Sequence, residues 1–445
     1  MPPSIRSLCW KPPGRVAVVG GLLLTAAIQG NANEEFELLK MRYGKIHTIA
    51  GRGALDSNGG NDWREEYEGG PAREAELSEA HNAQADVFGN VFIVDKDSHA
   101  VRKVRPDGTI IRVAGTNVAG DGGDEPQPGT ECALSGPNGL YVQLDGTCFI
   151  FDTGNRKIRR LSPQGEISTV LQDPTLSFVG RGLWANEAGT QIYYASGAEV
   201  RVWTRDGGTR VVASGFSGAL ANLTVDPQGR LVVTDRSAHS VFRIETSGEV
   251  TRIAGNGTTS GGGEGRPAVE TGLEEARGVA FFPDGSFLVC THRGSDLWFV
   301  DSEGIAHLFI NGVRNSNPRA GEGTVASDLG AKLSEVRAVN ITPAGDIILT
   351  QSDESNVRIV ENLAPISVGP PAVLLPEALN GLRVQWLSSS EASVLEWTGS
   401  LLSEPWRVAT IVGATSNGAT WTDLDWPHPE GRFFRVRPAV RWPAP

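Results

Sequence analysis

A chain of 445 residues, 39% of them apolar, exceeds the length of one ordinary domain and can bury a large core. The formal net charge of −12 argues against general binding to nucleic acid. Four cysteines are too few for a disulfide framework, and we expect buried thiols.

Residues 1–32 have the pattern of a secretory signal peptide. Lys11 and Arg15 precede an apolar run over residues 16–28, and small residues follow, ending at Ala32. The apolar run is too short to span a bilayer comfortably. We therefore expect cleavage, no transmembrane span in the mature chain, and a secreted or periplasmic location; the alternative is an uncleaved anchor.

The run from Ala85 to Thr116 predicts four short strands separated by turns. The segments VFIVD, VRKV and IIRVAG are rich in β-branched residues, and Gly89-Asn90 and Pro106-Asp107-Gly108 are turn residues. Turn residues between such runs are typical of a four-stranded antiparallel meander. Upstream, between Arg52 and Ala83, lies a long connector in which we expect a short helix at residues 72–80.

The meander repeats along the chain around five further turn glycines, Gly146, Gly189, Gly229, Gly285 and Gly345. The sixth copy, NITPAGDIILTQSDESNVRIVEN, lacks its fourth strand, and the isolated segment IHTIAGRG from Ile46 resembles that strand. A strand from the other end of the chain removes the exposed sheet edge. We therefore predict an all-β fold: a six-bladed β-propeller over residues 45–362, closed by an N-terminal strand. The alternative, a multi-sheet sandwich, would not repeat so regularly.

The repeats resemble the NHL-repeat β-propeller family. The segments GNVFIVD, GTCFIFD and GRLVVTD, each followed by a polar turn and V-R or I-R or their like, carry the resemblance. The connectors AGTNVAGDGGDEPQPGTECALSGPNGL and AGNGTTSGGGEGRPAVETGLEEARGVA are similar to the Gly-rich loops of secreted bacterial members. The resemblance covers about residues 46–362 and implies the fold, but no single chemistry, because one propeller architecture hosts many functions. Some eukaryotic members bind RNA, which export and acidity argue against here.

After the ring, residues 363–373 form a proline-bearing linker, and residues 374–441 predict a small β-sandwich. The strand-like segments include LRVQW, WRVATIV, ATWTDL and RFFRVRP, and the module resembles fibronectin-type-III-like modules of exported bacterial proteins. Its aromatic markers are Trp386, Trp397, Trp406, Trp421 and Trp426. We expect them to pack the module's core, and sugar binding is the alternative.

Equal spacing from the turn glycines defines a column of candidate site residues. Eight positions before each glycine stand His81, Asn138, Arg181, Ala221, Arg277 and Arg337. This spacing places all six around the mouth of the central channel. Arginine forks suit carboxylate or phosphate, so His81, Asn138, Arg181, Arg277 and Arg337 form a candidate site for an anionic ligand. The alternative is that Glu79, Glu275 and Glu335 neutralise the ring as structural ion pairs.

The turns between the second and third strands reach the same face and form a second circle. They supply Asp97, His99, Asn155, Arg156, Arg236, His239, His292, Arg293 and Asp353. We interpret Asp95, Asp152 and Asp235 just before them as turn-capping residues. A metal site built from His81, His99, His239 and His292 would need large loop movements.

The column offers one histidine, one asparagine and no carboxylate, and we assign no catalytic residue, metal ligand or cofactor. The sequence favours an exported, non-enzymatic interaction scaffold that binds a protein or a small anion through its loop-rich face. The alternative is a metal-dependent hydrolase or lyase, because some six-bladed relatives, gluconolactonase-like and amidating-lyase-like, hold a divalent metal in the channel. An electron-transfer quinoprotein lacks positive support.

Overall fold

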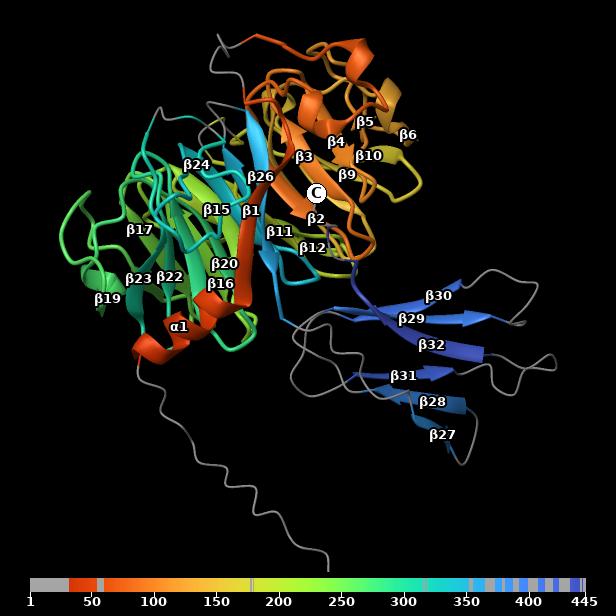
Figure 1. Cartoon of the computed structure of the whole chain (residues 1–445). Coiled ribbons are helices and arrows are strands. Elements are labelled where there is room, and N and C mark those ends of the chain that lie inside the picture. Colours follow the sequence, from red (N-terminus) through yellow and green to blue (C-terminus); the bar gives the residue numbers. More distant parts are fainter. Residues whose placement is uncertain are drawn as a thin grey trace, which may run out of the picture.

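The computed structural model confirms an all-β six-bladed propeller (Figure 1). It describes residues 32–53, 60–176, 178, 180–314, 317, 319–351, 355–364, 373–377, 381–386, 392–398, 407–412, 419–423, 433–440 and 442. The predicted signal peptide therefore lies almost entirely outside the described residues. Among those residues, no helix has the length and apolar character needed to cross a membrane.

Each blade is an antiparallel meander, and the first strands of successive blades contact one another around a closed ring. Blade 1 contains β2 (Ala80–Ala85), β3 (Val91–Asp95), β4 (Ala100–Val104) and β5 (Ile110–Ala114). Blade 2 contains β7 (Pro137–Val142), β8 (Cys148–Asp152), β9 (Lys157–Leu161) and β10 (Glu166–Gln172). Blade 3 contains β11 (Leu183–Ala185), β12 (Gln191–Ser196), β13 (Glu199–Thr204) and β14 (Gly208–Ser214). Blade 4 contains β15 (Leu220–Val225), β16 (Leu231–Asp235), β17 (Ser240–Ile244) and β18 (Val250–Ala254). Blade 5 contains β20 (Ala276–Phe281), β21 (Phe287–Thr291), β22 (Leu297–Val300) and β23 (Ile305–Ile310). Blade 6 contains β24 (Val336–Ile341), β25 (Ile347–Gln351) and β26 (Asn356–Asn362).

The predicted N-terminal closure is confirmed. Strand β1 (Tyr43–Ala50) pairs antiparallel with β26 and completes blade 6. Glycines at equivalent positions show that β1 is a true outer strand. A Cβ on Gly115 would lie 2.1 Å from His99 O, and one on Gly51 would lie 2.2 Å from Ser355 O. Both glycines have positive φ, so the AG motif ends the outer strand of blade 6 as it ends that of blade 1.

Short segments of the connectors cover the outer edges of three blades. Strand β6 (Gln127–Pro128) pairs with β10, β19 (Arg266–Pro267) pairs with β23, and Pro71 bridges Thr109 beside β5. Each is followed by a single 3₁₀ turn: η2 (Ala72–Glu74), η3 (Gly129–Glu131) and η5 (Ala268–Glu270). The helix predicted over residues 72–80 is therefore wrong beyond its first turn, because the chain there returns to extended conformation before β2. These added segments satisfy edge groups that would otherwise pair with another chain.

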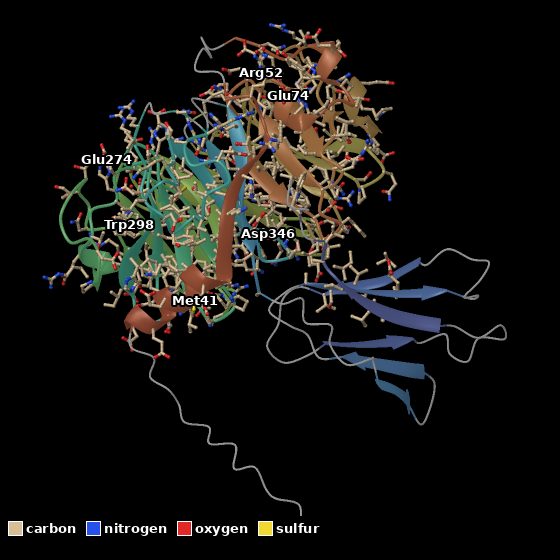
Figure 2. All side chains as sticks on the ribbon, viewed as in Figure 1. Met41, Arg52, Glu74, Glu274, Trp298 and Asp346 are labelled. Carbon is tan, nitrogen blue, oxygen red and sulfur yellow. The ribbon has the colours of Figure 1, made fainter. Side chains whose placement is uncertain are left out.

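The core lies in layers between neighbouring blades rather than at one centre. Phe92 and Val94 of blade 1, for example, pack against Leu140 and Ile150 of blade 2. Figure 2 shows side chains filling the space between blades, with Trp298 in the layer between blades 4 and 5. One apolar residue in the first strand of each of blades 2 to 6 is buried in these layers, namely Leu140, Leu183, Leu223, Val279 and Val339.

A helix without a counterpart in the repeats precedes the ring. Helix α1 (Ala32–Arg42) has acidic residues in its first turn and basic residues in its last, which suits the helix dipole. Phe36 and Leu39 are buried against blades 5 and 6, and the Phe36 ring stacks 4.7 Å from the His307 ring. The helix thus holds the start of the closing strand against the propeller.

The C-terminal region contains two three-stranded sheets, consistent with the predicted small sandwich. One contains β27 (Val373–Glu377), β28 (Gly381–Trp386) and β31 (Ala419–Asp423); the other contains β29 (Ser393–Thr398), β30 (Arg407–Val412) and β32 (Phe433–Pro438). The second sheet contacts the propeller, because Val440 N–H donates to Val87 O at 3.0 Å and Ala392 N–H to Pro343 O at 2.8 Å. Residues 365–372 of the predicted linker lie outside the described residues.

The three aspartates interpreted as caps do bind backbone. Asp152 Oδ1 accepts the Ser135 N–H at 2.8 Å, Asp235 Oδ2 accepts the Ser217 N–H at 2.7 Å, and Asp95 accepts the Ser78 N–H. Each bond ties the end of a second strand to the connector that enters the same blade. The described cysteines, Cys132, Cys148 and Cys290, are buried free thiols.

Candidate functional site

Five of the six column residues occupy the same backbone feature. In β2 the pairing register with β3 slips between Ala80 and Asn82, so His81 is the extra residue of a β-bulge. The same slip occurs in each of four other first strands and falls on Asn138, Ala221, Arg277 and Arg337. A bulge re-aims the side chain of its extra residue. The predicted column is therefore a set of equivalent bulges, with Arg181 just before β11.

At four of the five bulges, the residue two positions before the bulge is held by the preceding blade. Glu79, Glu275 and Glu335 have positive φ values of 63°, 56° and 45°. Their backbone N–H groups donate to Ser355 Oγ at 2.8 Å, His239 Nδ1 at 3.0 Å and Ser295 Oγ at 2.9 Å. Gly136 N–H donates to His99 Nδ1 in the same way. His99 and His239 of the second circle thus fasten adjacent blades together.

Three predicted residues and one glutamate form a polar network on one side of the ring. His81 Nδ1 lies within hydrogen-bonding distance of Asn138 Oδ1, and His81 Nε2 lies 3.2 Å from both Arg337 Nη1 and Glu79 Oε1. Asn138 Nδ2 in turn donates to Phe178 O at 2.8 Å. Glu79 lies 3.5 Å from Arg337 Nη2 and also pairs with Lys96. Around Arg337 the alternative of a structural ion pair is therefore realised.

Arg181 and Arg277 behave differently, although both side chains are buried. Arg181 is 8% exposed and Arg277 is 2% exposed. In the described part of the chain, Nε and Nη1 of both guanidinium groups have no hydrogen-bond partner. Burial lowers the pKa of Arg181 to about 9, with Arg337 and Arg236 adding to the effect. Burial and the same neighbouring charges also lower the pKa of Arg277. Two buried cations thus repel each other, and neither forms an ion pair with a carboxylate among the described residues.

The other two glutamates do not neutralise Arg277. Glu275 Oε2 lies 2.8 Å from His292 Nδ1, and its Oε1 lies 3.4 Å from Arg293 Nε. Glu335, which is fully buried, pairs with Arg314. Both glutamates lie two residues before their bulges, but the Glu275 side chain turns toward His292 and Arg293, and the Glu335 side chain turns toward Arg314. Among the described residues, neither Glu275 nor Glu335 forms an ion pair with Arg277, although the charge of Glu275 acts to raise the pKa of Arg277.

Two members of the second circle join the cluster, although the sequence analysis left them out of the site. Arg236 lies close enough to lower the pKa of Arg181, Arg277 and Arg337. His292 is buried, and its pKa is lowered by burial and then by Arg277. Their positions in the sequence could have indicated this, because Arg236 and His292 each directly follow the second strand of a blade. Arg293 is exposed and bound to Glu275, and Asp353 lies outside the described residues.

The remaining polar members of the second circle have structural partners. Asn155 Nδ2 donates to Gly120 O and to Asp152 Oδ2, both at 2.8 Å. Asp97 pairs with Lys96 at 3.0 Å, and Arg156 is the positive-φ residue that ends a 3₁₀ turn, η4 (Thr153–Asn155). Among the residues that the structure covers, no three His, Cys, Asp or Glu side chains gather as a metal site would require.

Two buried neutral imidazoles predict that acid lowers stability. The folded-state pKa values of His81 and His292 lie below the ordinary 6.5, so the unfolded chain binds more protons below that pH. The free energy of unfolding should then fall as pH decreases from about 6.5. We expect His292→Gln to reduce this slope by about 1.4 kcal/mol per pH unit. Urea unfolding between roughly pH 4.5 and pH 7 measures it, and an unchanged slope would contradict a neutral His292.

The opposite end of the channel is polar but carries amides rather than charges. A cavity of about 240 Å³ is lined there by Gln84, Tyr141, Asn222 and Asn340, together with apolar side chains of the first strands. Asn340 Nδ2 donates to Asn82 Oδ1 at 2.9 Å. The positive charge of the channel is therefore confined to the end that holds the bulges. We call this end the arginine mouth, defined by Arg181, Arg277 and Arg337.

Comparison with known proteins supports the fold. The sequence matches no protein-family model and no curated protein. A protein of unknown function from Bacteroides thetaiotaomicron has a similar structure, with a TM-score of 0.54, 14% identity, and coverage of 71% of this chain and 75% of that chain. An auxiliary nutrient binding protein from Bacteroides ovatus has a TM-score of 0.53 and 13% identity, with coverage of 72% of this chain and 76% of that chain. Another from Bacteroides thetaiotaomicron has a TM-score of 0.51 and 12% identity, with coverage of 71% of this chain and 76% of that chain. At such identities the likeness shows the fold alone.

Proposed function

We propose that this protein is a non-enzymatic binding protein that takes a small anion at the arginine mouth. One observation carries the proposal: Arg181 and Arg277 are buried as cations, and Nε and Nη1 of each have no hydrogen-bond partner among the described residues. A buried charge without a partner destabilises a fold by several kcal/mol, roughly. Such an arrangement is expected where a ligand supplies the missing charge.

The chemistry of the mouth favours a carboxylate or a phosphate. Guanidinium groups present N–H donors in a planar fork, which matches two oxygens of either anion. Arg236 adds a fourth positive charge that is partly exposed, so it can attract the anion from solvent. His81 and Asn138, both buried and held in their network, would border the bound anion on one side.

The proposed function also includes export of the protein. The predicted signal peptide at residues 1–32 would place the propeller outside the cytoplasm, secreted or periplasmic, with its connectors exposed on the face that carries the mouth. NHL-type repeats and a fibronectin-like C-terminal module remain predictions from the sequence. Two propellers of similar structure are named as nutrient binding proteins, and a binding role is in keeping with those names. A protein partner on the connectors would be a second use of the same face.

The test is anion binding by the mature protein, purified without chelator or added metal. Native mass spectrometry would reveal a retained anion, and titration calorimetry with citrate and with inorganic phosphate would measure affinity. We expect Arg181→Gln to weaken binding roughly tenfold to a hundredfold, because it removes charged hydrogen bonds. Arg210→Gln, an exposed arginine in the same blade, is the matched control and should change nothing.

Two results would overturn this proposal. If neither probe binds and no anion is retained, the mouth is not an anion site. If elemental analysis of the same sample finds one stoichiometric divalent metal that His81→Ala removes, the metal-dependent hydrolase or lyase becomes the better hypothesis.

A further inference from the structure

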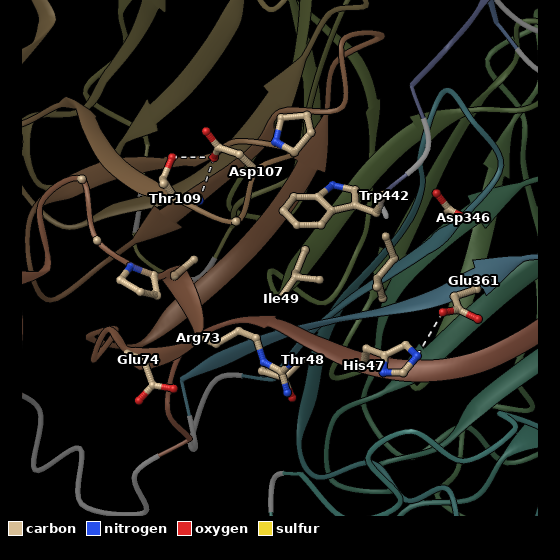
Figure 3. A pocket seen from close by; sticks show the side chains of 17 residues that line it. His47, Thr48, Ile49, Arg73, Glu74, Asp107, Thr109, Asp346, Glu361 and Trp442 are labelled. Carbon is tan, nitrogen blue, oxygen red and sulfur yellow. Dashed lines mark hydrogen bonds and ion pairs between the residues drawn. The ribbon is translucent and has the colours of Figure 1, made fainter. Parts of the chain in front are cut away.

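A second hollow lies far from the arginine mouth, at the seam where the ring closes. It has a volume of about 530 Å³, which is within the range of small-molecule sites. Its lining comes from β1, from residues 69–74, from the turn at 106–109, from Asp346 just before β25, from β26, and from Trp442 in the C-terminal tail (Figure 3). We call it the seam groove.

Apolar side chains form the floor of the seam groove. Ile49 and Ile359 are buried there, and Pro71 and Pro106 lie at its sides. Trp442 is half-buried and packs on the same apolar cluster. Figure 3 shows its indole between Asp107 and Thr109 on one side and Asp346 and Glu361 on the other. The tail is held in place by the backbone hydrogen bond from Val440 to Val87.

Carboxylates surround this apolar floor. Glu74 and Asp107 are exposed at one end, and Asp346 and Glu361 lie at the other; Figure 2 shows Glu74 near Arg52 and Asp346 on the side of the C-terminal sheets. The two basic side chains in the lining are already paired. His47 Nε2 lies 3.0 Å from Glu361 Oε1, and Arg73 Nη2 lies 2.9 Å from Glu322 Oε1.

We propose that the seam groove binds an organic ammonium compound with an apolar body. The charge of the lining selects a cation, because the lining holds four carboxylates and only two basic side chains. Glu361 is the partner of His47, whereas Arg73 pairs with Glu322 outside the groove. The apolar body would lie on Ile49 and Ile359. The cationic head would lie near the face of Trp442, where the ring quadrupole attracts positive charge, within reach of the carboxylates. An anionic ligand is repelled from this site, so the two sites of the protein take ligands of opposite charge.

Occupancy would also affect the closure of the ring. The groove exists only while β1 is paired with β26 and while the tail lies on blade 1. A ligand that binds this arrangement, and not the open chain, stabilises it by mass action. Cation binding should therefore raise the unfolding temperature of the full-length mature protein.

The experiment uses choline and 1,5-diaminopentane as probes, with sodium chloride at equal ionic strength as the salt control and maltose as a neutral probe. Thermal unfolding and titration calorimetry report binding. We expect both cations, and not maltose, to bind, and Trp442→Ala to weaken them roughly threefold to thirtyfold. Because Trp442→Ala could disturb the tail, the double variant Glu74→Gln with Asp107→Asn tests the charge alone, and we expect it to weaken binding roughly threefold to tenfold.

The matched control is Glu249→Gln with Asp206→Asn, which neutralises two exposed carboxylates on blades 4 and 3 and should leave binding unchanged. The proposal is overturned if neither cation stabilises the protein beyond the salt control. It is also overturned if the Glu74 and Asp107 double variant binds as tightly as wild type, or if maltose binds where the cations do not. None of these outcomes bears on citrate or phosphate binding at the arginine mouth.

Discussion

Replacing Asp95 by alanine is expected to lower the free energy of unfolding by about 3–5 kcal/mol, because it breaks a buried ion pair from one side. Asp95 and Arg102 are both fully buried, and Asp95 Oδ2 accepts from Arg102 Nε at 3.2 Å. Arg102 also lies 3.6 Å from the centre of the Trp63 ring. Without Asp95 the guanidinium keeps bonds to Ser98 and Asn117 but loses its carboxylate.

Urea unfolding followed by tryptophan fluorescence measures this loss. Asp206→Asn, at an exposed turn, is the control and should change stability by less than about 0.5 kcal/mol. The double variant Asp95→Leu with Arg102→Met should recover much of the loss, because it removes both buried charges. A loss below about 1 kcal/mol for Asp95→Ala would show that Ser98 and Asn117 alone can hold Arg102.

A substitution at the arginine mouth is expected to raise the free energy of unfolding instead of lowering it. Replacing Arg277 by methionine should stabilise the ligand-free protein by about 1–4 kcal/mol, because a buried cation without compensation is replaced by an apolar side chain of similar length. Burial, Arg181 and Arg337 already depress the pKa of Arg277. The same variant should lose the stabilisation that citrate or phosphate gives to wild type.

Arg102→Met provides the matched comparison, since Arg102 is equally buried but paired with Asp95. We expect Arg102→Met to destabilise the protein and Arg277→Met to stabilise it. If Arg277→Met lowers the unfolding midpoint as Arg102→Met does, Arg277 has a structural role and the anion site loses its main support. Stability that rises as binding is lost is typical of a site that stores strain for its ligand.

The architecture was largely predictable because repetition reveals backbone features. Six turn glycines with the same flanking pattern of strands identify six meanders, and the AG motif after Ile49 marks β1 as the missing outer strand. The same spacing located the bulges that carry His81 and Arg277, since a bulge recurs at a constant distance from its turn.

The sequence did not predict which polar side chains bind one another, because each side chain contacts neighbours from other blades. Glu275 turns to His292 rather than to Arg277, which no periodicity encodes. The seam groove joins Ile49, Asp107, Glu361 and Trp442, which are far apart in the sequence. Helix α1 has no copy in the repeats, so it carried no repeated signal.

The closing strand also sets the order in which the chain can fold. Strand β1 is synthesised early, yet its partner β26 follows roughly 300 residues later. At ordinary ribosomal rates that separation corresponds to roughly 15–60 s, during which β1 lacks the strand with which it pairs. A nascent chain in this state is a substrate for chaperones, and a chain that stops before residue 356 leaves blade 6 without its third strand and β1 without a partner. Completion of the propeller therefore waits for the third strand of blade 6, and termination before that strand leaves β1 and β25 with open edges.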